Sequence, residues 1–182
     1  MEDPEVPTEN LHEEIHHHAE HSREKWVLGV ALSSALLAGF AAVASLMAGH
    51  HANEAMISQI ESSDQWSYYQ AKGIKETALT SKAEILDALG KPGSAADKEK
   101  IAQYQRDKDQ IEKKADELER EAQTHLRTHE VLASSVTMFQ IAIAVGAISV
   151  LIRSQRFWLA SLVVGVIGIA FLVESFFTAG GH

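Results

Sequence analysis

Three long stretches of the chain carry almost no charge, and this feature limits the possible folds more than any other. Asp, Glu, Lys and Arg are absent from residues 26–48 and 131–152, and Glu174 is the only such residue in 157–177. Each stretch is about 20 residues long, enough for a helix to cross a bilayer core of ~30 Å. Helices buried in a soluble core usually keep a polar face, whereas these stretches are apolar on every side. The sequence therefore predicts an all-α integral membrane protein with three transmembrane helices.

The same pattern predicts the organisation of the chain. We expect an acidic, His-rich tail (1–25), a first span (26–48), an extramembrane segment (49–130), a second span (131–152), a basic turn (153–156), a third span (157–177) and a C-terminal tail (178–182). The first span does not resemble a signal peptide, because the residues before it are mostly acidic.

Basic residues next to the spans predict the orientation. Arg23, Lys25, Arg153 and Arg156 would all lie on one side of the membrane, and basic flanks usually stay in the cytoplasm. The N-terminus is then cytoplasmic and segment 49–130 periplasmic. Arg120 and Arg127 favour the opposite orientation.

The charged middle segment has one clear break, at Gly90-Lys91-Pro92-Gly93. Gly often ends a helix and Pro cannot continue one, so two helical arms of about 40 residues are expected. Residues at 3- and 4-residue steps in the returning arm have coiled-coil spacing: Ile101, Tyr104, Lys108, Ile111, Ala115, Leu118, Ala122, His125, His129, Leu132 and Val136. The seam expected for the outgoing arm is Met56, Ile60, Ala71, Ile74, Ala78, Ile85 and Ala88. We predict a long antiparallel helical hairpin extending from spans 1 and 2; the alternative is a partly flexible charged linker.

The chain contains ten His residues and no Cys. In a helical tail, His12 would lie beside His16, and His17 beside His21. Such pairs suit transition metals, which bind imidazole nitrogen; the alternative is a solvated acidic tail that gains protons at about pH 6. The stretch from His12 to His16 also matches the His-Glu-x-x-His pattern of zinc proteases. It has neither a scaffold nor an obvious third ligand, so we expect no enzyme activity and no catalytic residues.

A second group of polar residues is expected where the hairpin meets the spans. Folding about the break places His129 opposite Glu54, and Leu132 opposite His51. The candidate metal ligands or titrating groups here are His50, His51, Glu54, His125, His129 and Glu174. Alternatively, His125 and His129 are hydrogen-bonded seam residues, and Glu174 is an exposed carboxylate at the lipid headgroups.

Two features predict contacts with other proteins. The first is a polar and aromatic patch, which would bind a partner or pack on the returning arm: Glu54, Glu61, Asp64, Trp66, Tyr68 and Tyr69. The second is a set of small residues in the spans, from which we expect a homo-oligomer: Ala31, Ala35, Gly39, Ala142, Gly146, Gly165 and Gly168. A net charge of -9 argues against nucleic acid as a partner.

The most distinctive stretch is Asp64-Gln65-Trp66-Ser67-Tyr68-Tyr69-Gln70-Ala71-Lys72. With the His-rich tail, the immediate first span and the two closing spans, it resembles a family of small bacterial inner-membrane proteins described as a domain of unknown function. The resemblance covers nearly the whole chain and implies a bacterial inner membrane and three spans. It implies no activity and no functional residues.

Two functions remain open from the sequence. The first is an oligomeric membrane scaffold or accessory subunit, embedded in the lipid bilayer, that presents the hairpin to a protein partner. The alternative is a metal- or proton-handling membrane protein that uses the clustered histidines.

Overall fold

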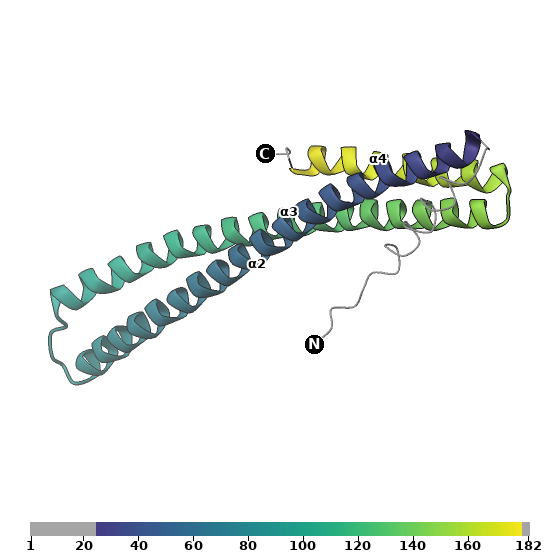
Figure 1. Cartoon of the computed structure of the whole chain (residues 1–182). Helices are drawn as coiled ribbons and strands as arrows, with labels where there is room; N and C mark the ends of the chain where they lie inside the picture. The colour runs from purple at the N-terminus through teal and green to yellow at the C-terminus, as the bar shows by residue number, and fades with distance from the viewer. Residues whose placement is uncertain (1–24, 180–182) are drawn as a thin grey trace, which may run out of the picture. The chain divides into compact units, whose positions relative to one another are not determined.

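Residues 25–179 are described by the structure, a computed structural model, and they form three helices (Figure 1). These are α2 (Lys25–Ala88), α3 (Ala95–Leu151) and α4 (Gln155–Ala179), and no strand occurs among the described residues. By length and composition, each helix contains a window apolar enough to cross a membrane. The prediction of an all-α chain with three long apolar helices is confirmed.

The end of α2 is set by Gly90. This residue has a φ of 66°, and its N–H donates to the carbonyl of Asp87 at 2.9 Å. The N–H of Lys91 donates to the carbonyl of Leu86, also at 2.9 Å. The two bonds form a Schellman turn, in which glycine takes the left-handed position without steric cost.

The end of α3 has the same kind of turn, but Arg153 takes the left-handed position, with a φ of 51°. Its N–H donates to the carbonyl of Val150 at 3.2 Å, and the N–H of Ser154 donates to Ser149 at 3.0 Å. Because α4 begins at Gln155, the connection is shorter than predicted and Arg156 belongs to the helix.

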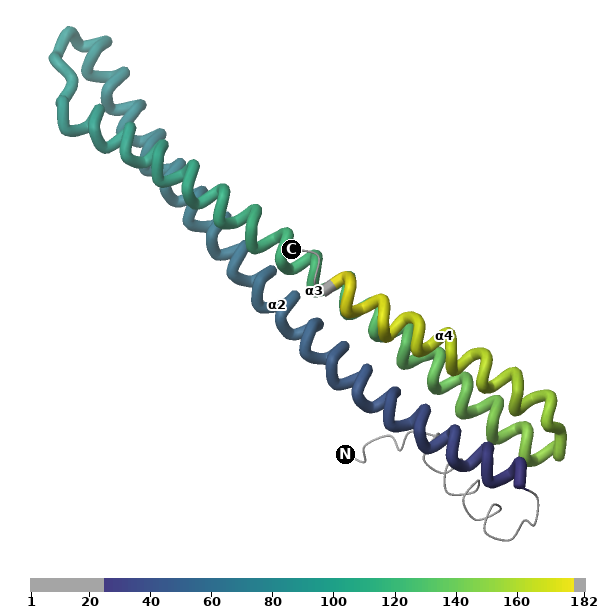
Figure 2. Tube along the Cα trace, turned by 90° about the horizontal axis from the view of Figure 1, so that it is seen from above, coloured from purple at the N-terminus to yellow at the C-terminus, as the bar shows by residue number. Residues whose placement is uncertain are grey.

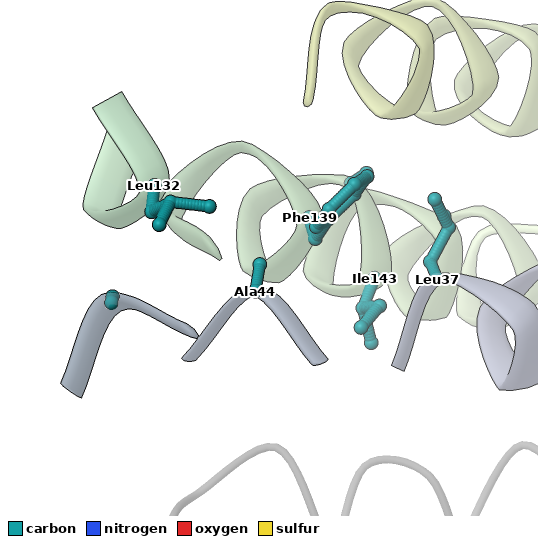
Figure 3. Packing of buried hydrophobic residues seen from close by; sticks show 7 residues of the cluster. Leu37, Ala44, Leu132, Phe139 and Ile143 are labelled. Atoms are coloured by element: carbon teal, nitrogen blue, oxygen red, sulfur yellow. The ribbon is translucent and has the colours of Figure 1, made fainter. Parts of the chain in front are cut away.

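The chain divides into two compact units, which are described separately. Unit 1 combines residues up to Ala52 with those from His125 onward, and unit 2 is Asn53–Thr124. In unit 1, parts of α2, α3 and α4 pack side by side (Figure 2). Figure 3 shows the larger apolar cluster of this unit, which α2 and α3 form together: Leu37, Ala44, Ala48, Leu132, Phe139, Ala142 and Ile143.

Small residues bring α4 close to the other two helices of unit 1. A Cβ added at Gly168 would lie 2.8 Å from the ring of Phe139, and one at Gly165 would lie 2.9 Å from Leu37. Ser135 donates to the carbonyl of Gly168 at 2.8 Å, which fixes α4 against α3. Small residues and hydroxyl groups are the usual means by which membrane helices pack closely.

This packing changes the interpretation of the small residues. Ala31, Ala142, Gly146, Gly165 and Gly168 are buried inside unit 1 of a single chain. The expectation of a homo-oligomer therefore gains no support from these five residues. Gly39 differs, because it is exposed and an added Cβ would meet nothing within 4 Å.

The outside of unit 1 is covered by large apolar side chains. Leu46 is 78% exposed and Phe177 is 77% exposed. Others of this kind on α2 and α4 are Leu28, Leu32, Leu36, Val43, Leu159, Val163, Val166, Val173 and Phe176. A soluble monomer rarely exposes so continuous an apolar surface.

In unit 2, the predicted stripe on α3 faces inward. Ile111, Ala115, Leu118 and Ala122 are buried, and Ile101, Tyr104 and Lys108 are half-buried. This prediction succeeded because apolar residues recur on α3 at the spacing of a single helix face.

The seam predicted for α2 is wrong. Met56, Ile60, Ile74 and Ile85 are between 55% and 70% exposed, and Ala71, Ala78 and Ala88 are exposed as well. Another set, at the same 3- and 4-residue steps, is buried or half-buried: Ala55, Ser58, Ser62, Gln65, Tyr69, Lys72, Glu76, Leu79, Ala83 and Leu86. Apolar periodicity does not indicate this face, because the inward face of α2 is largely polar. Ser62, for example, is buried and donates to the carbonyl of Ala115 at 3.1 Å.

Candidate functional site

The structure brings together some of the predicted site residues. His12, His16, His17 and His21 lie outside the described residues. Glu54 is half-buried in unit 2, and Glu174 is exposed on α4 in unit 1. The remaining candidates, His50, His51, His125 and His129, all belong to unit 1.

A pair of histidines joins α2 and α3 in unit 1. Nδ1 of His51 lies 2.9 Å from Nδ1 of His125, and their ring centroids are 5.2 Å apart. The ring of His50 lies next to that of His51, with 5.5 Å between centroids. His51 and His125 are half-buried, whereas His50 is exposed.

The short contact between the two imidazoles can be a hydrogen bond only in some protonation states. A hydrogen bond between two Nδ1 atoms needs a proton on one of them and a lone pair on the other. The bond can therefore form in the neutral or the singly protonated pair. If both rings are protonated, two N–H donors face each other and the bond is lost.

His129 has a different role. Its Nδ1 lies 2.9 Å from the carbonyl oxygen of Ala48, and because a carbonyl only accepts, this nitrogen donates. A donating Nδ1 is not free to bind a metal, which leaves Nε2 as the available nitrogen. Within the part of the chain that the structure describes, no group of three or more His, Cys, Asp or Glu residues is placed to hold a metal ion.

The observed pairing of histidines corrects the predicted register. Leu132 was expected opposite His51, but His125, seven residues earlier on α3, takes this place. A shift by seven residues leaves the 3- and 4-residue spacing unchanged, so apolar periodicity cannot detect it. The contact between the two histidines distinguishes the registers in unit 1.

A second group of interacting side chains lies in unit 2. We call it the polar–aromatic cluster, and its members are Tyr68, Tyr69, Lys72, Glu76, Tyr104, Gln105, Asp107 and Lys108. Lys72 pairs with Asp107 at 2.7 Å, and Lys108 pairs with Glu76 at 3.1 Å. Gln105 donates a further hydrogen bond to Glu76 at 2.9 Å. These bonds connect the α2 arm to the α3 arm.

Tyrosine rings cover both lysines of this cluster. Nζ of Lys72 lies 5.2 Å from the centroids of Tyr68 and Tyr104, and that of Lys108 lies 4.9 Å from the centroid of Tyr69. A cation over an aromatic face is attracted by the ring electrons. The Lys72 side chain is only 13% exposed, so rings and carboxylate replace most of its water.

These contacts shift three pKa values. The hydrogen bond to Asp107, with a further one to Tyr68, raises the pKa of Lys72 above its usual value. Hydrogen bonds from Gln105 and Lys108 lower the pKa of Glu76, and the bond to Glu76 raises the pKa of Lys108. Each shift favours the charged form, so the cluster is a set of stable ion pairs.

The polar and aromatic patch was only partly anticipated. Tyr68 and Tyr69 belong to the cluster, and Trp66 contacts Tyr69 edge-on with 5.5 Å between centroids. Glu61 and Asp64 are exposed. Sequence reasoning missed Lys72, Glu76 and Asp107. Counting 3- and 4-residue steps from His51 along α2 reaches Lys72 and Glu76 and would have indicated both.

Comparison with known proteins places the chain in a family. No curated protein and no solved structure matches it. A family model does match, and the matched region includes nearly all of the three helices, the histidine pair and the polar–aromatic cluster. Its description is Domain of unknown function (DUF4337), it covers residues 26–178, and the chain therefore belongs to this family.

Proposed function

We propose that the protein is a membrane-anchored scaffold or accessory subunit of a bacterial inner membrane. The apolar windows of α2, α3 and α4 cross the bilayer. The α2 and α3 arms of unit 2 form an antiparallel coiled-coil hairpin that contacts a protein partner. The N-terminus lies in the cytoplasm and the hairpin in the periplasm.

The contrast between the two units carries this proposal. Unit 1 exposes large apolar side chains such as Leu46 and Phe177, which fit the hydrocarbon of a lipid bilayer better than water. Unit 2 exposes charged residues of both signs and holds its helices together with ion pairs. Two paired helices have no interior beyond their seam, so the side chains of unit 2 act mainly by contact with other molecules.

Tyr68 is the best candidate for such a contact. It is 49% exposed and lies at a surface hollow that is also lined by Gln65, Asp107, Gln110, Ile111 and Lys114. Tyrosine is enriched at protein interfaces because its ring is amphipathic and rigid. Lys72 contacts the face of the Tyr68 ring and so restricts the position of this ring.

The orientation is tested by thiol labelling, because the natural chain has no cysteine. Ser94→Cys lies in the exposed connection between the arms, and Gln155→Cys lies at the exposed start of α4. A membrane-impermeant maleimide should label Ser94→Cys in intact cells and Gln155→Cys only after permeabilisation. The reverse result would invert the orientation, and equal labelling of both in intact cells would contradict three spans.

The partner is tested by photo-cross-linking in native membranes. A photoreactive amino acid in place of Tyr68 should give a cross-linked product with another protein. The same amino acid in place of Glu99, exposed at the start of α3, should not. Equal products from the two positions would show that contact at Tyr68 is not selective.

The histidine pair favours a second candidate function, which is proton handling. Imidazole changes its charge between pH 5 and 8, and the bond between His51 and His125 cannot form when both rings are protonated. Nitrogen-15 NMR of labelled histidines should show a coupling across this bond at pH 8 and its loss at low pH. A coupling that persists when both rings are protonated would exclude this link between proton binding and helix contact.

A further inference from the structure

The exposed face of α2 in unit 2 has an unusual composition. Ten residues at 3- and 4-residue steps carry no charge, and all ten are exposed. We call them the α2 stripe: Met56, Ile60, Ser63, Ser67, Ala71, Ile74, Ala78, Ser81, Ile85 and Ala88. Four of them are large apolar residues, and the other six are Ser or Ala.

This arrangement is the reverse of what a solvated helix requires. In water, an amphipathic helix turns its apolar face inward and its charged face outward. In unit 2, the inward face of α2 contains Lys72 and Glu76, whereas the α2 stripe has no charge and Ile74 is 70% exposed. The stripe therefore has the composition of a helix contact surface.

We propose that the α2 stripe binds the α2 stripe of a second copy of this chain. This proposal rests on the membrane placement proposed above. Two copies with the same orientation in one bilayer are related by a two-fold axis along the membrane normal, so their equivalent helices run parallel. The pair is then parallel and in register, with Ile74 against Ile74.

The charges beside the stripe fit this partner. One flank carries Asp64, Lys75 and Lys82. The other flank consists of Gln59, Trp66, Gln70, Thr77 and Glu84, and Glu84 is its only charged residue. In a parallel pair of helices, each flank faces the opposite flank of the partner. Every charged residue of the first flank would thus face Gln or Thr, and no like charges would meet.

The length of the stripe is sufficient for a stable contact. From Met56 to Ala88 it extends about 50 Å at ~1.5 Å per residue. Met56, Ile60, Ile74 and Ile85 each expose on the order of 100 Å², so together they supply about half of the roughly 800 Å² that each partner buries in a standard interface. The Ser and Ala residues between them allow the backbones to approach and supply the rest.

Unit 1 gives a separate reason to choose a second copy. The same steps, counted back along α2, reach Gly49, Leu46 and Ala42, which are all exposed. A Cβ added at Gly49 would meet nothing within 4 Å, so the backbone is open to a neighbouring helix there. A helix that pairs with this part of α2 must itself lie in the bilayer, and α2 of a second copy does so.

Disulfide cross-linking of the full-length chain in native membranes tests the proposal. Ser67→Cys lies on the stripe, and Thr80→Cys is an exposed control on another face of the same helix. The two positions are matched, because each hydroxyl donates to the carbonyl four residues earlier at 3.0 Å. A disulfide needs Cβ atoms about 4 Å apart. On oxidation, most Ser67→Cys chains should become covalent dimers, whereas Thr80→Cys chains should stay monomeric.

A second variant shows whether the stripe itself causes the contact. Ile74→Glu in the Ser67→Cys chain should abolish the dimer, because two carboxylates would meet at the interface. Gln103→Glu, exposed on α3, should leave the dimer unchanged. Helix content, measured by circular dichroism, should be equal in both variants, since Ile74 is outside the seam.

Two cross-linking results would overturn the proposal, as would the absence of the Ser67→Cys dimer. One is equal cross-linking of Ser67→Cys and Thr80→Cys, and the other is a Ser67→Cys product that contains a different protein. The maleimide labelling of Ser94→Cys reports the membrane placement independently. Normal labelling of Ser94→Cys without a Ser67→Cys dimer would therefore reject the pairing of two α2 stripes and leave the proposed function intact.

Discussion

Replacing Gly168 by alanine tests the packing of α4 at a point where a methyl group has no room. The added Cβ would lie 2.8 Å from both Cδ1 and Cε1 of Phe139, and 3.3 Å from the Cβ of Met138. Phe139 cannot easily retreat, because it is 0% exposed and its ring stacks on Phe40 with 6.0 Å between centroids. Either the ring or the whole of α4 must move.

The expected cost follows from this overlap. Carbon atoms in contact are normally ~3.5 Å apart, so the ring must shift by about 0.7 Å. Overpacking a tight core costs about 1–3 kcal/mol. The higher helix propensity of alanine offsets about 0.5–1 kcal/mol of this cost. The net loss of unfolding free energy should be about 1 kcal/mol.

A matched control separates the effect of helix propensity from the cost of overpacking. Gly39→Ala introduces the same methyl group in unit 1, where nothing lies within 4 Å. It should gain about 0.5–1 kcal/mol, since only the propensity changes. The difference between Gly168→Ala and Gly39→Ala is then the overpacking cost alone, about 1–3 kcal/mol.

The measurement is the free energy of unfolding in detergent micelles, by titration with sodium dodecyl sulfate. A double variant, Gly168→Ala with Phe139→Leu, vacates the space of the ring and should recover part of the loss. If Gly168→Ala proves as stable as Gly39→Ala, the ring of Phe139 does not lie over Gly168. The described packing of α3 and α4 would then be refuted.

Acid should weaken unit 2, because the lowered pKa of Glu76 stabilises the fold above pH 4.5 and this contribution is lost as the pH falls below that value. Thermal melts of the full chain at pH 7 and pH 3 should differ less for Glu76→Gln than for Glu84→Gln, an exposed control. Arg153→Gly should stabilise the chain by roughly 1 kcal/mol in the same detergent titration, because glycine takes the left-handed position at lower cost. The metal-handling alternative predicts that a transition metal co-purifies with the full chain and that the amount of bound metal falls when residues 1–25 are removed. If elemental analysis finds no metal in either sample, this alternative is rejected.

Much of the fold follows from simple patterns in the sequence. The three helices are predictable because each contains a long apolar window, and Gly90 marks the end of α2 because it takes a left-handed conformation. The stripe on α3 is predictable because Ile111 and Leu118 repeat at the spacing of one helix face. All these features depend on local composition.

The inward face of α2 could not be found in this way. Its contact with α3 uses Ser62, Lys72 and Glu76, which a search for apolar residues excludes. The more apolar face, with Ile74 and Ile85, is the exposed one. Apolar periodicity identifies a contact surface but does not say which partner covers it.

The candidate site was predicted in part. His51 and His125 were expected in the same region, and they do meet, but the register between them was wrong by seven residues. A repeating seam has the same appearance after a shift of seven residues. Only a specific pair such as His51 with His125 distinguishes the two registers.

The contacts between α2 and α3 also suggest an order of folding. Lys82 and Asp97 are 15 residues apart along the chain, Lys72 and Asp107 are 35 apart, and Ser62 and Ala115 are 53 apart. The separation grows to 74 for His51 and His125, and to 81 for Ala48 and His129. The entropy lost in closing a loop increases with its length, so each contact, once formed, shortens the loop that the next one must close. The contacts between the two arms can therefore form one after another, starting at the Gly90 turn, and the contact between the two histidines forms near the end of this process.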